Sequence, residues 1–362
     1  MQTLSSSQID SAPSLEGKAG GPSVAGNESP RWGIIYCPKQ GVRRTHKRWE
    51  HIKELLDANE IAYDFVQSEG AESVLRLTKM LVTNGYETLI IVGGDSALNR
   101  ALNGLLSFDD DVRQRVCIGV IPNGRGNDFA SFWGYSEDDD QRTVRWLMER
   151  RVRKVDVGYI KVINQPADIV EKDESNHGEE GNGQTLDANN VEQKEQIRYF
   201  LNCVNVGLVA NIMKLKYKAR RIFGLTTLTY FASMILLLFQ RLEIKMKLRI
   251  NEEHIDRKLM SVCIGNCRAY GQTPNAVPYN GMLDVSVISC PGVRQLIEGL
   301  GMLFTGKFLS HKSVKAYRTP RTVIFSDIRT ASVSTDGIVL SDYKAPFEIG
   351  LKTEHINFII PS

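Results

Sequence analysis

The sequence lacks several signals that mark large classes of proteins. Residues 1–30 are rich in serine, glycine and alanine, and have no basic start followed by an apolar stretch, so they do not indicate a secretory signal. We expect them to form a disordered leader. The six cysteines are scattered, and the closest pair, Cys263 and Cys267, has no histidine at metal-ligand spacing. We therefore expect reduced, buried thiols and a cytoplasmic protein.

The sequence also lacks an excess of charge of either sign. Its 45 lysines and arginines nearly balance 42 aspartates and glutamates, for a net charge of +3. This balance argues against a dedicated nucleic-acid-binding protein, although it allows a local basic patch. With 362 residues, 42% of them hydrophobic, the chain has the composition of a globular protein of about two domains.

Residues 31–150 alternate short aliphatic runs with helical patterns. The aliphatic runs include "WGIIYC", "TLIIVGG" and "VCIGVIP". This alternation is typical of a parallel sheet covered by helices on both faces. In such sheets, ligands bind beyond the carboxyl ends of the strands. We therefore expect an α/β domain whose site follows these aliphatic runs.

Residues 151–335 contain mostly strand patterns and predict a largely antiparallel β domain. Residues 164–196 are polar and mostly acidic, so we expect an acidic insertion that forms a long loop within this domain. For residues 336–362, the family resemblance given below implies a return toward a cleft between the domains.

One apolar run, Ile222–Phe239, is about long enough to cross a membrane. It contains Gly224, Tyr230 and several hydroxyl side chains, so we favour a buried or pocket-lining helix over a span. The basic residues 214–221 that lead into it can meet anionic lipid headgroups or form a solvated helix face; both interpretations remain open.

A carboxylate follows two glycines at the end of one predicted strand. Gly93 and Gly94 have no Cβ, so backbone N–H groups there can turn toward a bulky anion, and the helix near Ser96 adds its positive end. Asp95 would repel a bare phosphate. It fits where a divalent cation lies between the two, or where it orients a hydroxyl that attacks the phosphate. The pattern indicates phosphoryl transfer from a nucleotide.

A similar turn follows the next strand. The stretch "PNGRGND" supplies two glycines for close approach, Gly124 and Gly126, a hydrogen-bonding amide at Asn127 and a second carboxylate at Asp128. Two such turns at consecutive strand ends are hard to explain by turn formation alone. Together they predict one phosphate-binding site.

These motifs resemble the diacylglycerol kinase catalytic family, which includes bacterial lipid kinases, sphingosine kinases and ceramide kinases, and which is more distantly similar to NAD kinases and phosphofructokinases. Here "GGDSALN" and "PNGRGNDFA" stand where that family has Gly-Gly-Asp-Gly-Thr-Leu-Asn and Pro-x-Gly-Thr-x-Asn-Asp-Phe-Ala. Further similar segments follow in order between Arg31 and Pro361: "RYFLNCVNVGL", "FGLTTLTY", "IGNCRAYGQTPNAVPYNGMLDVSVI" and "STDGIVL". The resemblance implies an α/β nucleotide-binding domain, similar to NAD kinase and phosphofructokinase, joined to a mostly antiparallel β-sandwich domain.

The resemblance also implies cofactors and site residues. ATP and Mg²⁺ are the implied cofactors, and Asp95 and Asp336 are the implied catalytic residues. A metal would be held by Asp95 and, in the second domain, by Asn280, Met282 and Asp284. The implied nucleotide-binding residues are Gly93, Gly94, Asp95, Ser96, Asn99, Gly124, Arg125, Gly126, Asn127, Asp128 and Lys39.

The sequence departs from the family pattern at functional positions. Ile338 stands where the family has a glutamate implied to act as general base, and isoleucine cannot take a proton. Either Asp95 carries that role, or a nearby carboxylate such as Asp342 substitutes, or the protein is slow or inactive. Arg125 replaces a threonine; its cation can grip phosphate or fold back onto an acidic neighbour.

The predicted function is that of an ATP-dependent lipid kinase that transfers the γ-phosphoryl group to a hydroxyl of diacylglycerol or a sphingoid-type lipid. We expect a lipid substrate at the membrane surface as its partner, peripheral membrane association, no nucleic acid, and a homodimer as an open alternative. Two other interpretations remain: a nucleotide- or lipid-binding pseudokinase, and a soluble small-molecule kinase that resembles NAD kinase.

Overall fold

The computed structural model describes residues 31–38, 43–163, 197–211, 213–214, 243–269, 272–290, 292–304, 307–341 and 343–362. The predicted leader, the acidic insertion, the apolar run Ile222–Phe239, Lys39 and Asp342 lie outside the described residues. None of the helices within those ranges combines the length and apolar character that crossing a bilayer requires.

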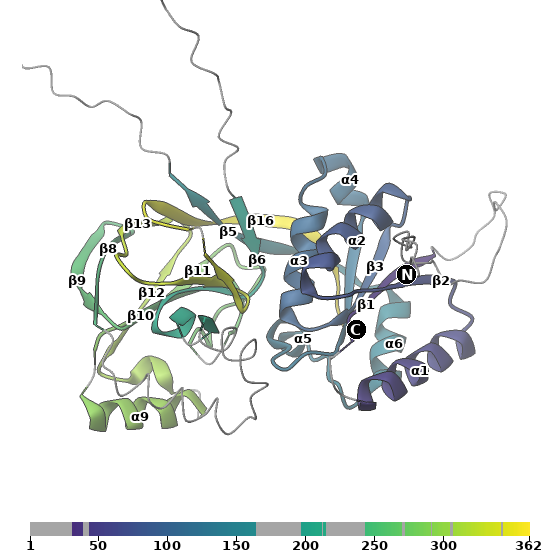
Figure 1. Ribbon diagram of the computed structural model, residues 1–362, viewed down its shortest axis with the longest axis horizontal. Coiled ribbons are helices and arrows are strands. Elements are labelled where there is room, and N and C mark those ends of the chain that lie inside the picture. Colours follow the sequence, from purple (N-terminus) through teal and green to yellow (C-terminus); the bar gives the residue numbers. More distant parts are fainter. Residues whose placement is uncertain are drawn as a thin grey trace, which may run out of the picture.

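The first half of the chain forms an α/β domain with a parallel sheet (Figure 1). Four neighbouring strands have the order β2-β1-β3-β4 and pair in parallel, as predicted. Strands β1, β3 and β4 are buried along their whole length, which explains their continuous aliphatic sequence. The elements are β1 (Trp32–Tyr36), α1 (Arg43–Ala58), β2 (Tyr63–Gln67), α2 (Ala71–Thr83), β3 (Thr88–Gly93), α3 (Asp95–Leu105), α4 (Asp110–Arg115), β4 (Cys117–Pro122), α5 (Asp128–Phe132) and α6 (Asp140–Glu149).

The second half forms the predicted antiparallel β domain. A six-stranded sheet has the order β12-β11-β10-β7-β14-β15, and every pair in it is antiparallel. One face of this sheet packs against β8, β13 and β16 around a single apolar core. The elements are β5 (Val152–Val162), β6 (Ile197–Phe200), β7 (Cys203–Gly207), β8 (Ile244–Ile250), β9 (Glu253–Leu259), β10 (Ser261–Gly265), β11 (Leu283–Ile288), α9 (Val293–Phe304), the 3₁₀ helix η1 (Phe308–Ser310), β12 (Val314–Thr319), β13 (Val323–Asp327), β14 (Val333–Thr335), β15 (Ile338–Leu340) and β16 (Phe347–Ile359).

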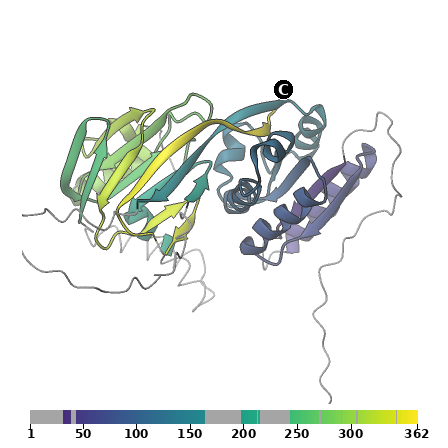
Figure 2. The ribbon, with the colours of Figure 1, turned by 90° about the horizontal axis from the view of Figure 1, so that it is seen from above.

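Strand β16 belongs to both domains. Its first part pairs with β13 of the β domain, through Phe347 and Ile349. Its last part, at Asn357 and Phe358, pairs in parallel with β4. Strand β5 runs antiparallel to it on both sides of the junction. Figure 2 shows this two-stranded ribbon passing from one domain to the other, so a ten-stranded sheet continues through the molecule.

A buried carboxylate holds the ribbon where the domains meet. Between Lys352 and Ile356 the register with β5 shifts, and Glu354 has a φ of 48°. Asp156 of β5, 1% exposed, accepts hydrogen bonds from the N–H of Glu354 at 2.9 Å and of Gly281 at 2.8 Å. One side chain therefore ties the bulge to the loop that precedes β11.

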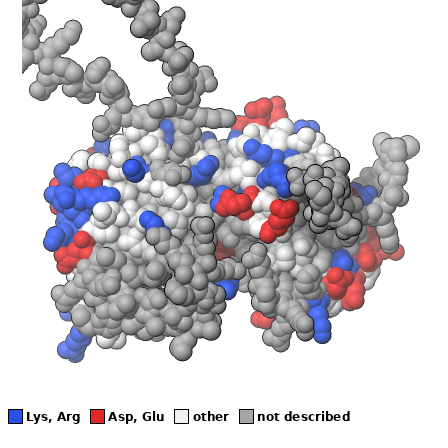
Figure 3. All heavy atoms as spheres, viewed as in Figure 1, with Lys and Arg blue, Asp and Glu red and all other residues white. Residues whose placement is uncertain are grey.

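The outer edge of the sheet in the β domain is charged. Strand β9 is the last in the order, and Figure 3 shows basic and acidic side chains mixed at that end of the molecule. Asp256 of β9 pairs with Lys245 and Lys247 of β8 at 3.5 and 3.4 Å. Charged side chains on an edge strand discourage pairing with another chain.

We predict that Asp156→Ala destabilises the fold by about 2–5 kcal/mol, because it leaves two buried N–H groups without an acceptor. Urea denaturation measures the change. Asp256→Ala is the matched control: it removes a half-exposed carboxylate from surface ion pairs, for an expected cost of about 0–1 kcal/mol. Equal costs for the two variants would contradict the role assigned to Asp156.

Candidate functional site

The two glycine turns lie directly against each other. Strands β3 and β4 end side by side, with Gly93 opposite Pro122, and the N–H of Asn123 donates to the carbonyl of Gly93 at 2.9 Å. A Cβ at Gly94 would lie 2.7 Å from the Cα of Gly124, and a Cβ at Gly124 would lie 2.4 Å from the Cα of Gly94. These glycines are therefore required for backbone contact between the turns, a reason that the sequence did not indicate.

Asn127 fixes the shape of the second turn. It adopts a left-handed conformation with φ 54°, which asparagine tolerates better than most residues. Its Oδ1 accepts from the N–H of Gly124 at 2.8 Å, and its Nδ2 donates to Glu137 at 2.8 Å. The side chain thus closes the turn and ties it to the segment before α6.

Asp95 joins three parts of the molecule. Its carboxylate accepts from the N–H of Asp128 at 3.0 Å and of Phe129 at 3.1 Å, so it caps α5 from the start of α3. It also accepts from Nδ2 of Asn202, in the β domain, at 3.0 Å. Oδ1 receives two of these bonds and Oδ2 one. Since a carboxylate has about four lone-pair sites, Oδ2 retains capacity for one more partner.

Gly126 leaves a space between two carboxylates. A Cβ at this position would lie 3.1 Å from Oδ2 of Asp95 and 3.7 Å from Oδ2 of Asp128. The described residues contain no cluster of three or more His, Cys, Asp or Glu side chains suited to a metal. Two carboxylates beside a residue without a side chain match the donor set that Mg²⁺ commonly uses, namely one or two carboxylates together with phosphate oxygens and water.

The other predicted nucleotide-binding residues differ in how exposed they are. Arg125 is exposed, as is Gly126, whereas Ser96 is half-buried at the start of α3. Arg125 forms no ion pair with another described residue, so the interpretation in which it pairs with an acidic neighbour has no support in the described part of the chain. Asn99 is 4% exposed, and its Nδ2 donates to the carbonyl of Tyr199 and to Asp336, both at 2.9 Å.

Asp336, a predicted catalytic residue, is buried among donors. Its carboxylate accepts from Asn99 and from the N–H groups of Leu201, Asn202 and Cys203, at 2.8–3.0 Å. Burial raises the pKa of Asp336 to about 6. The hydrogen bonds from Leu201, Asn99 and Cys203 lower this pKa, and the negative charge of nearby Asp95 raises it. Its geometry is that of an anchor that holds the start of β7 to α3.

The residues predicted to hold a metal in the second domain contact other protein groups. Asp284 on β11 pairs with the guanidinium of Arg318 on β12, whose Nε and Nη2 lie 2.7 and 3.4 Å from the two carboxylate oxygens. The Oδ1 of Asn280 accepts from the N–H of Met282 at 2.9 Å. The carboxylate predicted to bind a metal ion is thus neutralised by an arginine, a partner that the sequence reasoning missed because Arg318 lies 34 residues away on the neighbouring strand.

Two residues that contact the site, Arg48 of α1 and Asn202, were not among those predicted from the sequence. Arg48 donates to the carbonyl of Pro122 at 2.6 Å and, through Nε, to Asp140 at 2.9 Å, so it supports the second turn from behind. No local motif marks such a contact. Asn202 lies in a segment that carried the family resemblance, which was the available signal.

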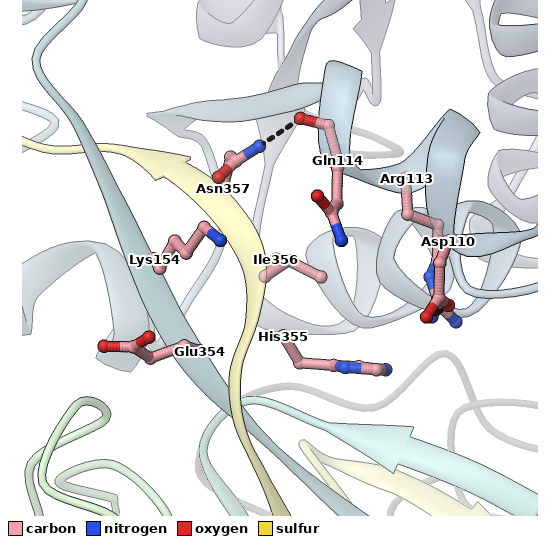
Figure 4. Close-up of a pocket in the computed structure, with 8 residues that line it drawn as sticks. All are labelled: Asp110, Arg113, Gln114, Lys154, Glu354, His355, Ile356 and Asn357. Carbon is pink, nitrogen blue, oxygen red and sulfur yellow. Dashed lines mark hydrogen bonds and ion pairs between the residues drawn. The ribbon is translucent and has the colours of Figure 1, made fainter.

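A separate small cavity lies at the domain junction (Figure 4). Its volume of about 50 Å³ is far below the roughly 300–1,000 Å³ of small-molecule pockets. Burial, together with Arg113 and Lys352, lowers the pKa of His355 to about 4, so this imidazole is neutral at pH 7. The side chains come from α4, β5 and the bulged part of β16, and none is a predicted site residue: Asp110, Arg113, Gln114, Lys154, Glu354, His355, Ile356 and Asn357.

Glycine-rich turns between a parallel strand and the N-terminus of a helix are typical places for phosphate groups to bind. Residues 31–160 match the model of the diacylglycerol kinase catalytic domain, and residues 202–354 match that of the YegS C-terminal NAD kinase beta sandwich-like domain. The chain therefore belongs to the diacylglycerol kinase catalytic-domain family, in the form that carries a YegS C-terminal domain.

Individual relatives match only parts of the chain. A diacylglycerol kinase of Bacillus subtilis (strain 168) is 28% identical over 130 residues, 35% of this chain and 41% of that protein. Sphingosine kinase B of Dictyostelium discoideum is 25% identical over 105 residues, 29% of this chain and 14% of that protein. The crystal structure of a diacylglycerol kinase from Bacillus anthracis str. Sterne has a TM-score of 0.59 at 16% identity, covering 91% of this chain and 96% of that one. This last likeness supports the fold.

We predict that Gly124→Ala destabilises the protein by about 1–3 kcal/mol and weakens nucleotide binding, because the new methyl group would separate the two turns. Thermal unfolding and calorimetry measure the two effects. Gly70→Ala, before α2, is the control: a Cβ there meets nothing within 4 Å, so we expect a change within about 0.5 kcal/mol. Unchanged nucleotide affinity in Gly124→Ala would contradict the assignment of this turn.

We also predict that Mg²⁺ shifts the melting temperature of the wild type and of Asp284→Asn by the same amount. Arg318 already neutralises this carboxylate, so its loss removes an ion pair and no metal ligand. Differential scanning calorimetry with Mg²⁺ and with a chelator gives the comparison. A Mg²⁺-dependent shift that disappears in Asp284→Asn would contradict this prediction and support a metal site at Asp284.

Proposed function

We propose that the protein is an ATP-dependent lipid kinase that works at the membrane surface and phosphorylates a hydroxyl of diacylglycerol or a sphingoid-type lipid. The observation that carries the proposal is the contact between the turns at Gly94 and Gly124, with Asp95 beside them. This arrangement brings backbone N–H groups, the start of α3 and a carboxylate to one place. Family membership supports lipid phosphorylation over other uses of such a site.

In the proposed reaction, the oxygen of the acceptor hydroxyl forms a bond to the γ-phosphorus as the bond to the β-phosphate oxygen breaks, and ADP leaves. Asp95 takes the hydroxyl proton on Oδ2, the oxygen with spare capacity. Exposed Arg125 neutralises phosphate charge. Asp336 positions the β7 segment and does not touch the reacting atoms.

Mg²⁺ would be held by Asp128 beside Gly126, together with phosphate oxygens and water, and would supply neutralisation of phosphate charge, while the open position of Asp95 Oδ2 receives the acceptor hydroxyl. The rest of the catalytic effect would come from positioning the reactants, which the two glycine turns and the side chains that hold them would provide. This explains how phosphoryl transfer can tolerate Ile338, a half-buried residue of β15. General bases typically contribute about 10²–10⁴-fold, so their loss need not abolish a reaction that depends mainly on alignment and charge.

Ile338 also favours a second candidate, a pseudokinase that binds nucleotide or lipid without turnover. A soluble small-molecule kinase that resembles NAD kinase is the third. The three differ in what receives labelled phosphate: a lipid in micelles, nothing, or a water-soluble alcohol.

The experiment measures transfer of labelled γ-phosphate from ATP and Mg²⁺ into mixed micelles that contain diacylglycerol, sphingoid base or ceramide. We expect Asp95→Asn to lower transfer at least about 100-fold, because it removes the proposed base and places an amide N–H against the donors of α5.

The matched control is Asp139→Ala. Asp139 also caps a helix, accepting from the N–H of Arg142 at 2.9 Å, but it does so at α6. We expect it to lose about 1 kcal/mol of stability and to keep its activity. Nucleotide binding without labelled product in the wild type would favour the pseudokinase. Equal activity losses in Asp95→Asn and Asp139→Ala would refute the role of Asp95.

A further inference from the structure

The ends of three neighbouring strands meet at Asn123. This residue directly follows β4 and is 6% exposed. Its backbone N–H donates to the carbonyl of Gly93, the last residue of β3, at 2.9 Å. Its side-chain Nδ2 donates to the carbonyl of Cys37, the residue after β1, at 3.1 Å. One buried residue therefore bonds the carboxyl ends of β1 and β3 to that of β4.

Arg48 of α1 holds the Asn123 side chain and the strand end next to it. Its Nη1 donates to Oδ1 of Asn123 at 3.4 Å and to the carbonyl of Pro122 at 2.6 Å. Its Nε donates to Asp140 at 2.9 Å, so the guanidinium is fixed from the other side. Flipping the amide of Asn123 would place its NH₂ group against the guanidinium and its oxygen against the carbonyl of Cys37. The partners of this amide therefore determine its orientation.

The same arginine completes a ring of contacts around the second glycine turn. Its guanidinium lies 4.0 Å from the carboxylate of Glu137, which accepts from Nδ2 of Asn127 at 2.8 Å. Oδ1 of Asn127 accepts in turn from the N–H of Gly124 at 2.8 Å. The ring runs from Pro122 through these side chains back to Gly124, so one network holds both ends of the turn.

These strand ends carry the parts of the candidate site. In the sequence, β1 leads to Lys39, β3 leads to Gly94 and Asp95, and β4 leads to Gly124. Phosphoryl transfer needs the attacking oxygen, the phosphorus and the leaving oxygen in line, and a misplacement of about 1 Å can cost about 100-fold in rate. A residue that fixes the distances between the strand ends therefore controls how accurately the phosphates meet Asp95.

We propose that Asn123 is a positioning residue for phosphoryl transfer. Together with Arg48, it sets the ends of β1, β3 and β4 so that phosphates on the two glycine turns lie in line with the hydroxyl that Asp95 receives. The inference rests on the proposed lipid kinase function and deepens it. Each polar group of the Asn123 side chain has a protein partner, so the residue acts through the turns and does not touch the reacting atoms. The family pattern leaves this position open, which is why the sequence did not mark it.

The experiment combines ATP affinity with the rate of transfer. Calorimetry with ATP and Mg²⁺, in the absence of lipid, measures binding without turnover. Transfer of labelled γ-phosphate into mixed micelles of diacylglycerol or sphingoid base gives the rate at saturating ATP. We expect Asn123→Ala to weaken ATP binding about tenfold, because the turns are no longer preorganised. We expect it to lower the rate at saturating ATP at least about tenfold, because saturation does not restore alignment.

Asn357→Ala is the matched control. Its Nδ2 also donates to a distant backbone carbonyl, that of Gln114 at 2.7 Å, but it lies beside Cys117 at the opposite end of β4. We expect both asparagine variants to lower the melting temperature by about 2–4 °C, and Asn357→Ala to keep its ATP affinity and rate. Equal losses of affinity and rate in the two variants would show that Asn123 only stabilises the fold, and would overturn the proposal.

Arg48→Lys tests the same network if Asn123→Ala does not fold. Lysine keeps the positive charge but cannot hold the guanidinium fork that reaches several acceptors at once. We expect losses of about threefold in ATP affinity and in rate. Arg318→Lys is the control for this variant, since Arg318 also bridges a carboxylate and a carbonyl, those of Asp284 and Asn275, and we expect no loss there. Wild-type affinity and rate in Arg48→Lys would contradict the network.

The remaining outcomes separate the inference from the kinase function. Weaker ATP binding in Asn123→Ala with an unchanged rate at saturating ATP overturns the positioning role, because bound phosphates would still be aligned. Transfer that Asn123→Ala leaves unchanged, with unchanged affinity, refutes the inference and leaves the lipid kinase function standing. ATP binding that depends on Asn123 and not on Asn357, with no transfer to any lipid by the wild type, supports the role of Asn123 in the turns and refutes the kinase function. A wild type that does not bind ATP overturns both.

Discussion

The candidate site depends on the hydrogen bonds that the carboxylate of Asp95 accepts. Its three donors come from the first turn of α5 and from Asn202 of the β domain, while the residue itself begins α3. The same group therefore determines where the second glycine turn ends and where the β domain meets it. These contacts give Asp95 a structural role, so we expect its substitution to disturb the packing of α5 and of the β domain against α3.

The rest of the junction repeats this principle with backbone donors. Asp336 collects the N–H groups of residues 201–203, and Asp156 collects those of Glu354 and Gly281. Each carboxylate gathers loops that are distant in sequence, and each is buried, so its donors cannot turn to water instead. With β16 paired to both sheets, these contacts explain how two domains of different architecture keep one site aligned.

Periodicity predicted the two architectures because it depends on local sequence: buried parallel strands are continuously aliphatic, and strands with one buried face alternate. The position of the candidate site was predicted on similar grounds, since glycines after a buried strand mark the carboxyl edge of a sheet. Long-range partners were not predictable. The sequence around Asp284 gives no sign that Arg318 pairs with it. The sequence around Gly94 gives no sign that Gly124 packs against it. The contacts of Asp336 were not predictable either, because its backbone donors lie more than 130 residues earlier in the chain.

The replacement of the family glutamate by Ile338 is easier to understand in this setting. Because Oδ2 of Asp95 keeps an open lone pair, the junction contains a proton acceptor even without that glutamate.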